Sequence, residues 1–133
     1  MKLSTKTRYA VRAVLDLNNH YKNCPVSIKD IAARQKISER YLENIFHALR
    51  KADILISSKG KGGGFVLGRS LNDINLLEIT EILDGPLNIV DCTDDNSTAC
   101  FTKNCKSKSL WKKINLQMKD VLSQVALSDI ENL

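Results

Sequence analysis

Three of the four cysteines lie close together in the second half of the chain, at Cys92, Cys100 and Cys105. They fall in a polar stretch of turn-forming residues without helical or strand periodicity, which we expect to be a loop that needs something to order it. Reactive and metal-binding thiolates occur in such loops, whereas structural cysteines are usually buried in cores. The pattern therefore favours a metal or redox site over simple packing.

The residues alone leave four interpretations of this site open. An iron–sulfur cluster is held mostly by cysteine thiolates, and an incomplete set with a weak fourth ligand would suit a sensor. Zinc normally binds four ligands that include closely spaced cysteine pairs, and the chain has no Cys-x2-Cys pair. The thiols could also form a redox switch, or bind no ligand at all. A stable disulfide is disfavoured because we expect a cytoplasmic protein.

The fourth cysteine and the two histidines do not extend this set. Cys24 lies at a helix break with no second cysteine nearby, so we interpret it as a small, semi-buried residue. His20 and His47 both fall in predicted helices of the basic half of the chain. Because no constellation of histidines and acids accompanies the cysteines, we predict that the protein is not an enzyme.

The elements that must position these groups centre on residues 27–69. Ser27 is predicted to cap an apolar-periodic helix, with Asp30 three residues later. A turn at residues 35–37 separates it from a second helix capped by Ser38. Two short helices joined by a few residues match the helix-turn-helix plan. The apolar stripe of the second helix is Tyr41, Leu42, Ile45, Phe46 and Leu49.

A glycine-rich hairpin is predicted directly after the second helix. The β-like runs 54–58 and 64–67 flank residues 59–63, where glycine supplies the positive φ of a tight connection. Lys59 and Lys61 project from its tip, so the hairpin reads as a basic wing. The order of these pieces predicts a mainly α-helical protein with a small β-hairpin, organised as a winged helix-turn-helix domain.

Further helices are predicted on both sides of this motif. Thr5 or Thr7 opens one that runs to about Tyr21, and residues 76–83 form another that should pack on it. A helix with an apolar stripe is predicted from Ser109 to about Leu127, and so short a chain has few other elements that could cover this stripe. The stripe predicts an antiparallel dimerisation helix, with packing on its own domain as the alternative. The stripe is Leu110, Trp111, Ile114, Met118, Val121, Leu122 and Val125.

The chain is expected to divide into a DNA-binding domain, residues 1–85, and a part with the cysteine loop and the dimerisation helix, residues 86–133. Residues 1–70 carry fourteen Lys/Arg against five Asp/Glu, a net +9, whereas residues 71–133 carry six against ten, a net −4. A basic front half points to DNA phosphates. No transmembrane run or apolar signal core is seen, so we expect a cytoplasmic location.

Several stretches resemble the IscR/NsrR/RirA family of bacterial winged-helix regulators, the Rrf-type family. The resemblance covers nearly the whole chain, and the glycine-rich wing with the downstream cysteine trio carries it most specifically. It implies a homodimeric transcription factor, which we expect to act as a repressor or a dual regulator, with a [2Fe–2S] or [4Fe–4S] cluster held by Cys92, Cys100 and Cys105. Occupancy would set DNA affinity in response to iron–sulfur status, nitric oxide or redox stress. The matching stretches are residues 1–11, 37–43, 49–51, 59–68 and 110–111.

Position by position, the resemblance also assigns contacts to double-stranded DNA. Ser38, Arg40 and Glu43 match recognition-helix readers, and Lys59 and Lys61 match wing contacts. Arginine can bridge guanine O6 and N7, glutamate can accept from cytosine N4, and wing lysines can hold phosphate or enter the minor groove. The full predicted contact set is Ser38, Glu39, Arg40, Tyr41, Glu43, Lys59 and Lys61.

The fourth cluster ligand departs from the family pattern. Lys108 stands where one branch has a histidine, and Arg8 stands where another has an aspartate. An exogenous thiol or a residue of the partner chain remains open, and so does an aspartate of the loop. The alternative function is a metal-free DNA-binding regulator controlled by thiol oxidation or by a protein partner. The candidate aspartates are Asp91, Asp94 and Asp95.

Overall fold

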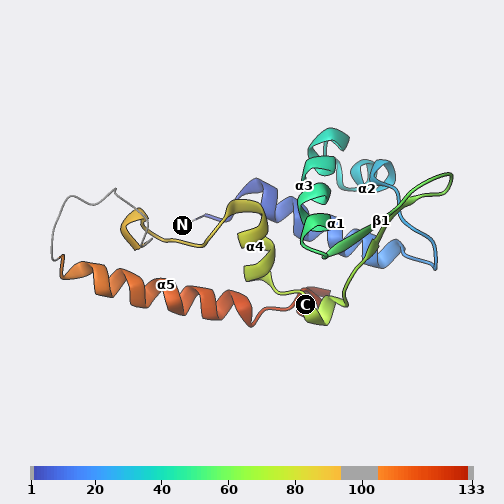
Figure 1. The fold of residues 1–133 in the computed structure, drawn as a ribbon. Coiled ribbons are helices and arrows are strands. Elements are labelled where there is room, and N and C mark those ends of the chain that lie inside the picture. The colour runs from blue at the N-terminus through green and yellow to red at the C-terminus, as the bar shows by residue number, and fades with distance from the viewer. Residues whose placement is uncertain (1, 94–104, 132–133) are drawn as a thin grey trace.

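The computed structural model describes residues 2–93 and 105–131 of the chain. They form a mainly α-helical structure with a two-stranded antiparallel hairpin and a long C-terminal helix, which confirms the predicted fold class (Figure 1). The elements in chain order are α1 (Thr5–His20), α2 (Ile28–Gln35), α3 (Glu39–Lys51), β1 (Leu55–Ser58), β2 (Gly64–Leu67), η1 (Leu71–Asp73), α4 (Leu76–Asp84), η2 (Asp91–Thr93), α5 (Ser107–Ser123) and α6 (Leu127–Glu131).

Serine side chains begin the first three helices. The hydroxyl of Ser27 accepts from the Asp30 N–H at 3.2 Å and that of Ser38 from the Tyr41 N–H at 3.3 Å, which confirms both predicted caps. The prediction for α1 is confirmed, because the helix begins at Thr5 and ends at His20, and the hydroxyl of Ser4 is its cap. These oxygens satisfy backbone donors that have no partner inside the helix.

A single apolar core joins the first three helices to the hairpin. Phe46 of α3 is fully buried, and its ring meets that of Phe65 from β2 edge-on, with centroids 5.1 Å apart. The buried stripes of α1 and α3 supply most of the remaining side chains. The largest fully buried residues are Phe46, Leu17, Ile31, Leu42, Ile45, Leu49, Ile54, Leu55, Ile74, Ile79, Leu127 and Val14.

The hairpin forms as expected, with β1 one residue shorter at its start than predicted. Leu55 pairs with Leu67 and Ser58 with Gly64, and Val26 adds a bridge to Phe65 that the sequence did not indicate. That bridge brings backbone close to Gly64, where a Cβ atom would lie 2.4 Å from the Val26 carbonyl oxygen. Only glycine therefore fits at the start of β2, directly after the wing tip.

Helix α4 lies between the winged motif and α5 (Figure 1). It packs against α1, as predicted, and its last residue is tied there by two hydrogen bonds. The Ser4 and Thr7 hydroxyls each donate to a different carboxylate oxygen of Asp84 at 2.8 Å. On its other side α4 meets α5, where Lys119 and Glu81 form an ion pair at 3.6 Å. α4 thus connects the two parts of the molecule.

Helix α5 starts earlier and ends earlier than the apolar pattern predicted. It spans Ser107–Ser123, so Val125 lies beyond its end. The chain turns there because Leu127 is fully buried in the core, with its N–H bonded to the Ile74 carbonyl at 2.9 Å. α6 therefore packs on the first part of the chain, and the division at residue 85 stays a prediction. No helix of the described residues is long and apolar enough to cross a membrane.

Candidate nucleic-acid interface and cysteine segment

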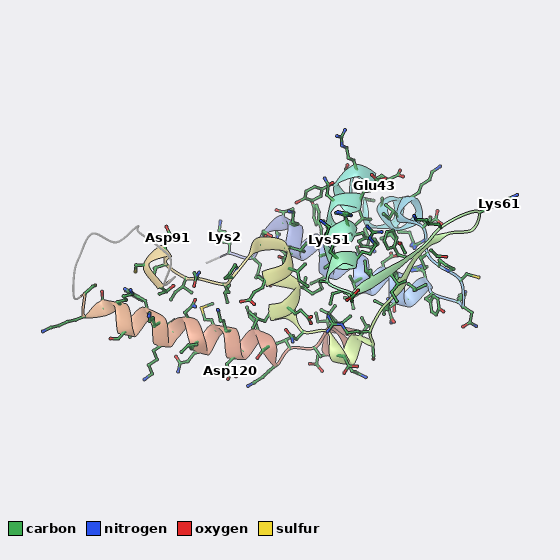
Figure 2. All side chains as sticks on the ribbon, in the orientation of Figure 1. Lys2, Glu43, Lys51, Lys61, Asp91 and Asp120 are labelled. Carbon is green, nitrogen blue, oxygen red and sulfur yellow. The ribbon has the colours of Figure 1, made fainter. Side chains whose placement is uncertain are left out.

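Most predicted DNA contacts lie on the outer face of α3 and at the wing tip. Figure 2 shows Glu43 on α3 and Lys61 on the wing, both on the side of the domain away from α5. The buried stripe of α3 turns the opposite face of the helix to solvent. The exposed members of the predicted set are Ser38, Glu39, Arg40, Glu43, Lys59 and Lys61.

Tyr41 differs from the rest of the predicted contact set. It is half-buried, and its ring meets Tyr9 of α1 edge-on at 5.9 Å between centroids. The Arg12 guanidinium lies 5.3 Å from the centroid of the same Tyr9 ring. This stack fixes the start of α3 against α1, so Tyr41 contributes packing whether or not it also touches DNA.

A buried carboxylate holds α2 against α1. Asp16 is 4% exposed, and its oxygens accept from the Arg34 guanidinium at 2.7 Å and from Gln35 Nε2 at 2.7 Å. Burial by itself would raise the pKa of the Asp16 carboxyl, but the hydrogen bonds from Arg34 and Gln35 outweigh it and leave the pKa lowered. The same bond raises the pKa of Arg34. The sequence analysis missed this group, although an acid next to the apolar stripe of α1 was a signal.

The wing positions its lysines through glycine. Gly60 and Gly62 have φ values of 97° and 80°, which confirms the prediction of positive φ at the tip. The Gly63 N–H bonds to the Gly60 carbonyl at 2.9 Å and closes the turn. Lys59 and Lys61 are exposed on this turn. The arrangement presents two positive charges beyond the body of the domain.

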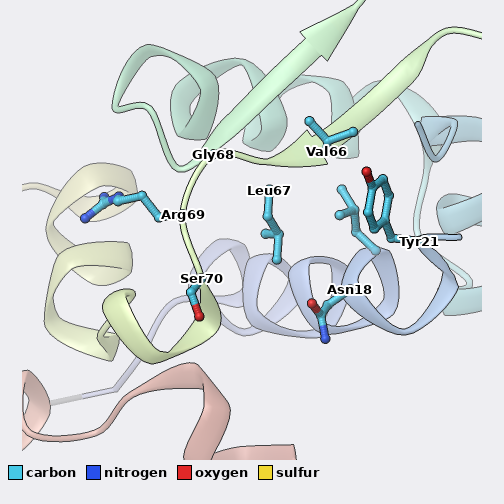
Figure 3. Close-up of a pocket in the computed structure, with 8 residues that line it drawn as sticks. Asn18, Tyr21, Val66, Leu67, Gly68, Arg69 and Ser70 are labelled. Carbon is cyan, nitrogen blue, oxygen red and sulfur yellow. The ribbon is translucent and has the colours of Figure 1, made fainter. Parts of the chain in front are cut away.

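A groove of about 380 Å³ lies between the end of α1 and the strand β2 (Figure 3). Figure 3 shows the Tyr21 ring beside Val66 at one end of the groove and Arg69 near the other. Tyr21 is 47% exposed. None of the predicted site residues lines the groove, which is lined by Leu17, Asn18, Tyr21, Val66, Leu67, Gly68, Arg69 and Ser70.

Two of the three candidate ligand cysteines lie within the described residues. Cys92 belongs to η2, which packs on α5, and Cys105 comes two residues before α5 begins. Both are partly exposed free thiols. Cys24 is an exposed thiol, so its interpretation as a semi-buried residue was wrong. Cys100 lies outside the described residues, as do Asp94 and Asp95. Within residues 2–93 and 105–131, no three His, Cys, Asp or Glu side chains converge to hold a metal ion.

The Cys105 sulfur occupies the position of a cap at the start of α5. The helix has no side-chain hydrogen bond from its N-cap residue Lys106, and the Cys105 Sγ lies 3.0 Å from the Ser107 hydroxyl oxygen. Hydrogen bonds from the Ser107 hydroxyl and then from the backbone lower the pKa of the Cys105 thiol. Donors at a helix start favour the thiolate, the form that binds metals and reacts with oxidants.

Helix α5 exposes part of its apolar stripe. Leu110 and Val121 of this stripe are 50% and 61% exposed, and Leu116, on another face of the helix, is 67% exposed. A shallow groove of about 230 Å³ runs along Met118 and Val121. The sequence analysis missed Leu116 and also missed that the buried residue of this helix is Asn115. Within the described chain this apolar surface is left facing solvent, which single soluble chains usually avoid.

A sequence model of the Rrf2 family, described as an iron-dependent transcriptional regulator, matches residues 3–132. The chain belongs to the Rrf2 family. It is 34% identical over 132 residues to the HTH-type transcriptional regulator IscR of Pectobacterium atrosepticum, an alignment covering 99% of this chain and 80% of that protein. These matches confirm the resemblance recognised in the sequence.

Two solved structures of the same architecture are close to this Rrf2 protein. IscR of T. potens has a TM-score of 0.77 and 36% identity, covering 99% of this chain and 87% of that one. CymR (YrzC), described as the global cysteine regulator of B. subtilis, also has a TM-score of 0.77, with 33% identity over 98% of this chain and 95% of its own.

Family membership establishes the coarse function of this Rrf2 protein. It is a DNA-binding transcriptional regulator and not an enzyme, as predicted. The winged-helix assignment of α1–α4 and the hairpin is confirmed by the same comparisons. The individual DNA contacts and the cysteine ligands stay predictions.

Proposed function

We propose that this Rrf2 protein is a homodimeric repressor whose affinity for its DNA operator is set by an iron–sulfur cluster at Cys92, Cys100 and Cys105. One observation carries the proposal. The two described cysteines lie beside the same helix, because η2 packs on α5 and Cys105 lies two residues before α5 begins. The family description as iron-dependent supports an iron cofactor.

The donor chemistry at these positions fits such a group. Thiolates are the usual ligands of iron–sulfur clusters, and the Cys105 thiol has a lowered pKa. Asp91 is exposed beside Cys92, so it is one candidate for the fourth ligand, with an exogenous thiol and a partner-chain residue as the others. A bound cluster would supply ligation that responds to iron supply, nitric oxide or oxidants.

The dimer is proposed to form along α5. Apolar side chains that project from a long helix are covered most simply by the same helix of a second chain, in an isologous contact. Val121 is 61% exposed and supplies that surface together with Ile114 and Met118, which line the same groove. Pairing of two winged domains in this way would let the regulator read two half-sites of an operator.

DNA contact is proposed at the exposed residues of α3 and the wing. Arg40 and Glu43 lie on the solvent face of α3, where they can reach base edges in a major groove. Lys61 lies at the wing tip, where a phosphate or a minor groove would be in reach (Figure 2). Ser38, Glu39, Tyr41 and Lys59 complete the proposed contact surface.

A route from the cysteines to DNA exists in the packing. η2 packs on α5, α5 packs on α4, and α4 packs on both α1 and α3. The Lys119–Glu81 ion pair and the Asp84 hydrogen bonds lie along this path. A change of ligation can shift operator affinity only if it favours one arrangement of these helices over another.

The test starts with anaerobic purification, an absorption spectrum and an assay of iron and sulfide. Operator binding is then compared for wild type and for a variant with Cys92, Cys100 and Cys105 all changed to Ala. Cys24→Ala serves as the matched control, since it removes one exposed thiol elsewhere. We expect only the triple variant to lose iron and the iron dependence of DNA binding. Equal operator affinity of wild type with and without iron would contradict the proposal.

A metal-free thiol switch is the second candidate function. The lowered pKa of the Cys105 thiol favours it, because thiolates are the form that peroxides oxidise. A colourless protein that resists reconstitution, but whose operator binding changes after peroxide treatment, would decide for this candidate. A regulator controlled by a protein partner would show neither response.

A further inference from the structure

The buried residue of α5 is polar. Asn115 is 7% exposed, although the side chain that follows it, Leu116, is 67% exposed. A buried amide costs stability unless its donor and acceptor are both hydrogen-bonded. An asparagine at the buried position of an amphipathic helix therefore calls for specific partners on the element that covers it.

Both groups of the Asn115 amide bond to the segment that leads into Cys92. The Oδ1 atom accepts from the Ile89 backbone N–H at 3.1 Å, and Nδ2 donates to Asn88 Oδ1 at 3.4 Å. The Thr93 hydroxyl, whose shorter contact at 2.7 Å is to the Val90 carbonyl, also lies 3.3 Å from Asn88 Oδ1. These side chains form a polar bridge from the middle of α5 to η2.

Cys92 lies inside this bridge, directly before the buried Thr93. The other end of the same segment is tied to α4, where the Leu87 N–H donates to Glu81 Oε1 at 3.3 Å. Apolar contacts would allow the segment to slide along α5, whereas hydrogen bonds have direction and length. The place of Cys92 along α5 therefore depends on the amide of Asn115.

We propose that Asn115 is a positioning residue that holds Cys92 in register with the start of α5, where Cys105 lies. The ligand role of Cys92 rests on the proposed function, but its positioning by Asn115 does not. In the apo protein the bridge limits opening of residues 88–93. In the cluster-bound protein it keeps the segments of Cys92 and Cys105 on one helix, so that loss of a ligand would change the position of α5.

The test measures how fast each cysteine of the anaerobic, reduced apo protein is alkylated by iodoacetamide, with mass spectrometry to separate the sites. Asn115→Leu preserves the size and burial of the side chain but removes both hydrogen bonds. We expect Cys92 to react about tenfold faster, because loss of two hydrogen bonds makes local opening more frequent. Cys24, which is far away on the surface, is the internal reference and keeps its rate.

The matched control is Asn19→Leu, which removes an exposed amide from α1 and should leave every alkylation rate unchanged. Asn115→Leu with the melting temperature of wild type and an unchanged Cys92 rate would overturn the proposal. Equal acceleration at Cys24 would overturn it too, since that reports general loosening. Should Asn115→Leu fail to fold, Asn88→Ala is used instead, because it removes the side chain that accepts from Asn115. An unchanged Cys92 rate or an equal acceleration at Cys24 would again overturn the proposal.

Iron retention separates this inference from the proposed function. After reconstitution with iron and sulfide, Asn115→Leu should lose iron to a chelator several times faster than wild type and Asn19→Leu. A wild-type protein that takes up no iron would refute the cluster proposal. The Cys92 alkylation rates in apo protein would still decide whether Asn115 positions this cysteine.

Discussion

The winged part of the molecule and the segment from residue 87 to the end of α5 are built by different interactions. The first is organised around buried apolar side chains, with Phe46, Leu49 and Ile79 fully enclosed. The second has a buried asparagine at its centre and leaves Leu116 and Val121 largely exposed. A self-contained core makes a rigid platform for DNA contact, whereas a segment with polar anchors and an uncovered apolar face depends on a partner or a ligand.

The contrast has one exception, which explains how the two parts stay together. α6 follows α5 but packs against η1 and α1, and Leu127 is fully buried there. The Leu76 N–H also bonds to the Val125 carbonyl at 2.9 Å. α5 is therefore attached to the winged part through its contacts with α4 and through α6 after its C-terminal end. A movement of α5 would therefore displace α4, on which it packs.

The largest effect is expected from the core. Phe46→Ala should lower the free energy of unfolding by about 4 kcal/mol, because it removes a large buried ring and its edge-on contact with Phe65. Urea denaturation followed by circular dichroism measures this change. Ile56→Ala is the control, since Ile56 is 53% exposed on the hairpin and should change stability by less than about 0.5 kcal/mol. Similar losses of unfolding free energy for the two variants would show that Phe46 does not contribute more to stability than an exposed residue.

The next effect concerns the apolar face of α5. Val121→Glu should weaken the proposed dimer by about 3 kcal/mol, because the substitution occurs twice in a symmetric contact and places charge in an apolar interface. Analytical ultracentrifugation over a range of concentrations measures the dissociation constant. The monomer should keep its helical content. Lys113→Glu, at an exposed position of the same helix, is the control; a wild-type protein that is monomeric throughout would refute the dimer.

A smaller loss of stability is expected at the buried carboxylate of α1, which holds α2 of the helix-turn-helix. Asp16→Asn should cost about 2 kcal/mol at neutral pH, since it weakens charge-assisted bonds to Arg34 and Gln35. The pKa of Asp16 is lowered in the folded protein, so its contribution is complete above the unfolded pKa of about 4. It is lost as the pH falls through the lower folded pKa.

Urea denaturation at several pH values checks this dependence. The difference in stability between wild type and Asp16→Asn should shrink as the solution is acidified below about pH 4. Asp120→Asn, at an exposed position on α5, is the control and should show little difference at any pH. A pH-independent difference for Asp16→Asn would mean that lost packing, rather than the charge, accounts for its effect.

The smallest effects are expected at the DNA surface, where no core is disturbed. Arg40→Ala should cost about 1–3 kcal/mol of operator binding and relax specificity, because arginine can read a guanine. Lys61→Ala should weaken operator and random duplex alike, as a phosphate contact does. Fluorescence anisotropy with both duplexes separates the two. Equal losses on both duplexes for Arg40→Ala would make it a backbone contact.

Local signals in the sequence predicted most of the winged part. The winged part contains helix caps at Ser27 and Ser38 and the apolar stripe of α3. Each of these features depends only on residues a few positions apart, so the sequence alone shows it. The glycine tip of the wing was predictable for the same reason, since positive φ is a property of single residues. The sequence left the start of α1 open between Thr5 and Thr7, because Ser4, Thr5 and Thr7 all carry a hydroxyl that can accept from a backbone N–H; the helix begins at Thr5.

Long-range pairings escaped prediction. The Asp16–Arg34 bond joins residues of two helices, and the bonds of Asn115 reach back to residues 88 and 89. The sequence around Asp16 or Asn115 does not identify its hydrogen-bond partner. A polar residue on a helix is predicted to be exposed unless the element that packs over it is known. The predicted end of α5 was too late for a related reason. Leu127 fits the apolar spacing of the helix, but it is buried in the core of the winged part instead.

By itself the sequence determined the winged-helix class, the basic character of the front half and the grouping of three cysteines ahead of a long amphipathic helix. Each of these depends on residue type and short spacing, which are the same in any chain conformation. Only the tertiary structure decided that α4 lies between the wing and α5, and that α6 returns to the core. It also decided that Asn115, rather than an apolar residue, faces the segment of Cys92. These depend on which surfaces meet, because burial turns an ordinary polar side chain into one that must be paired.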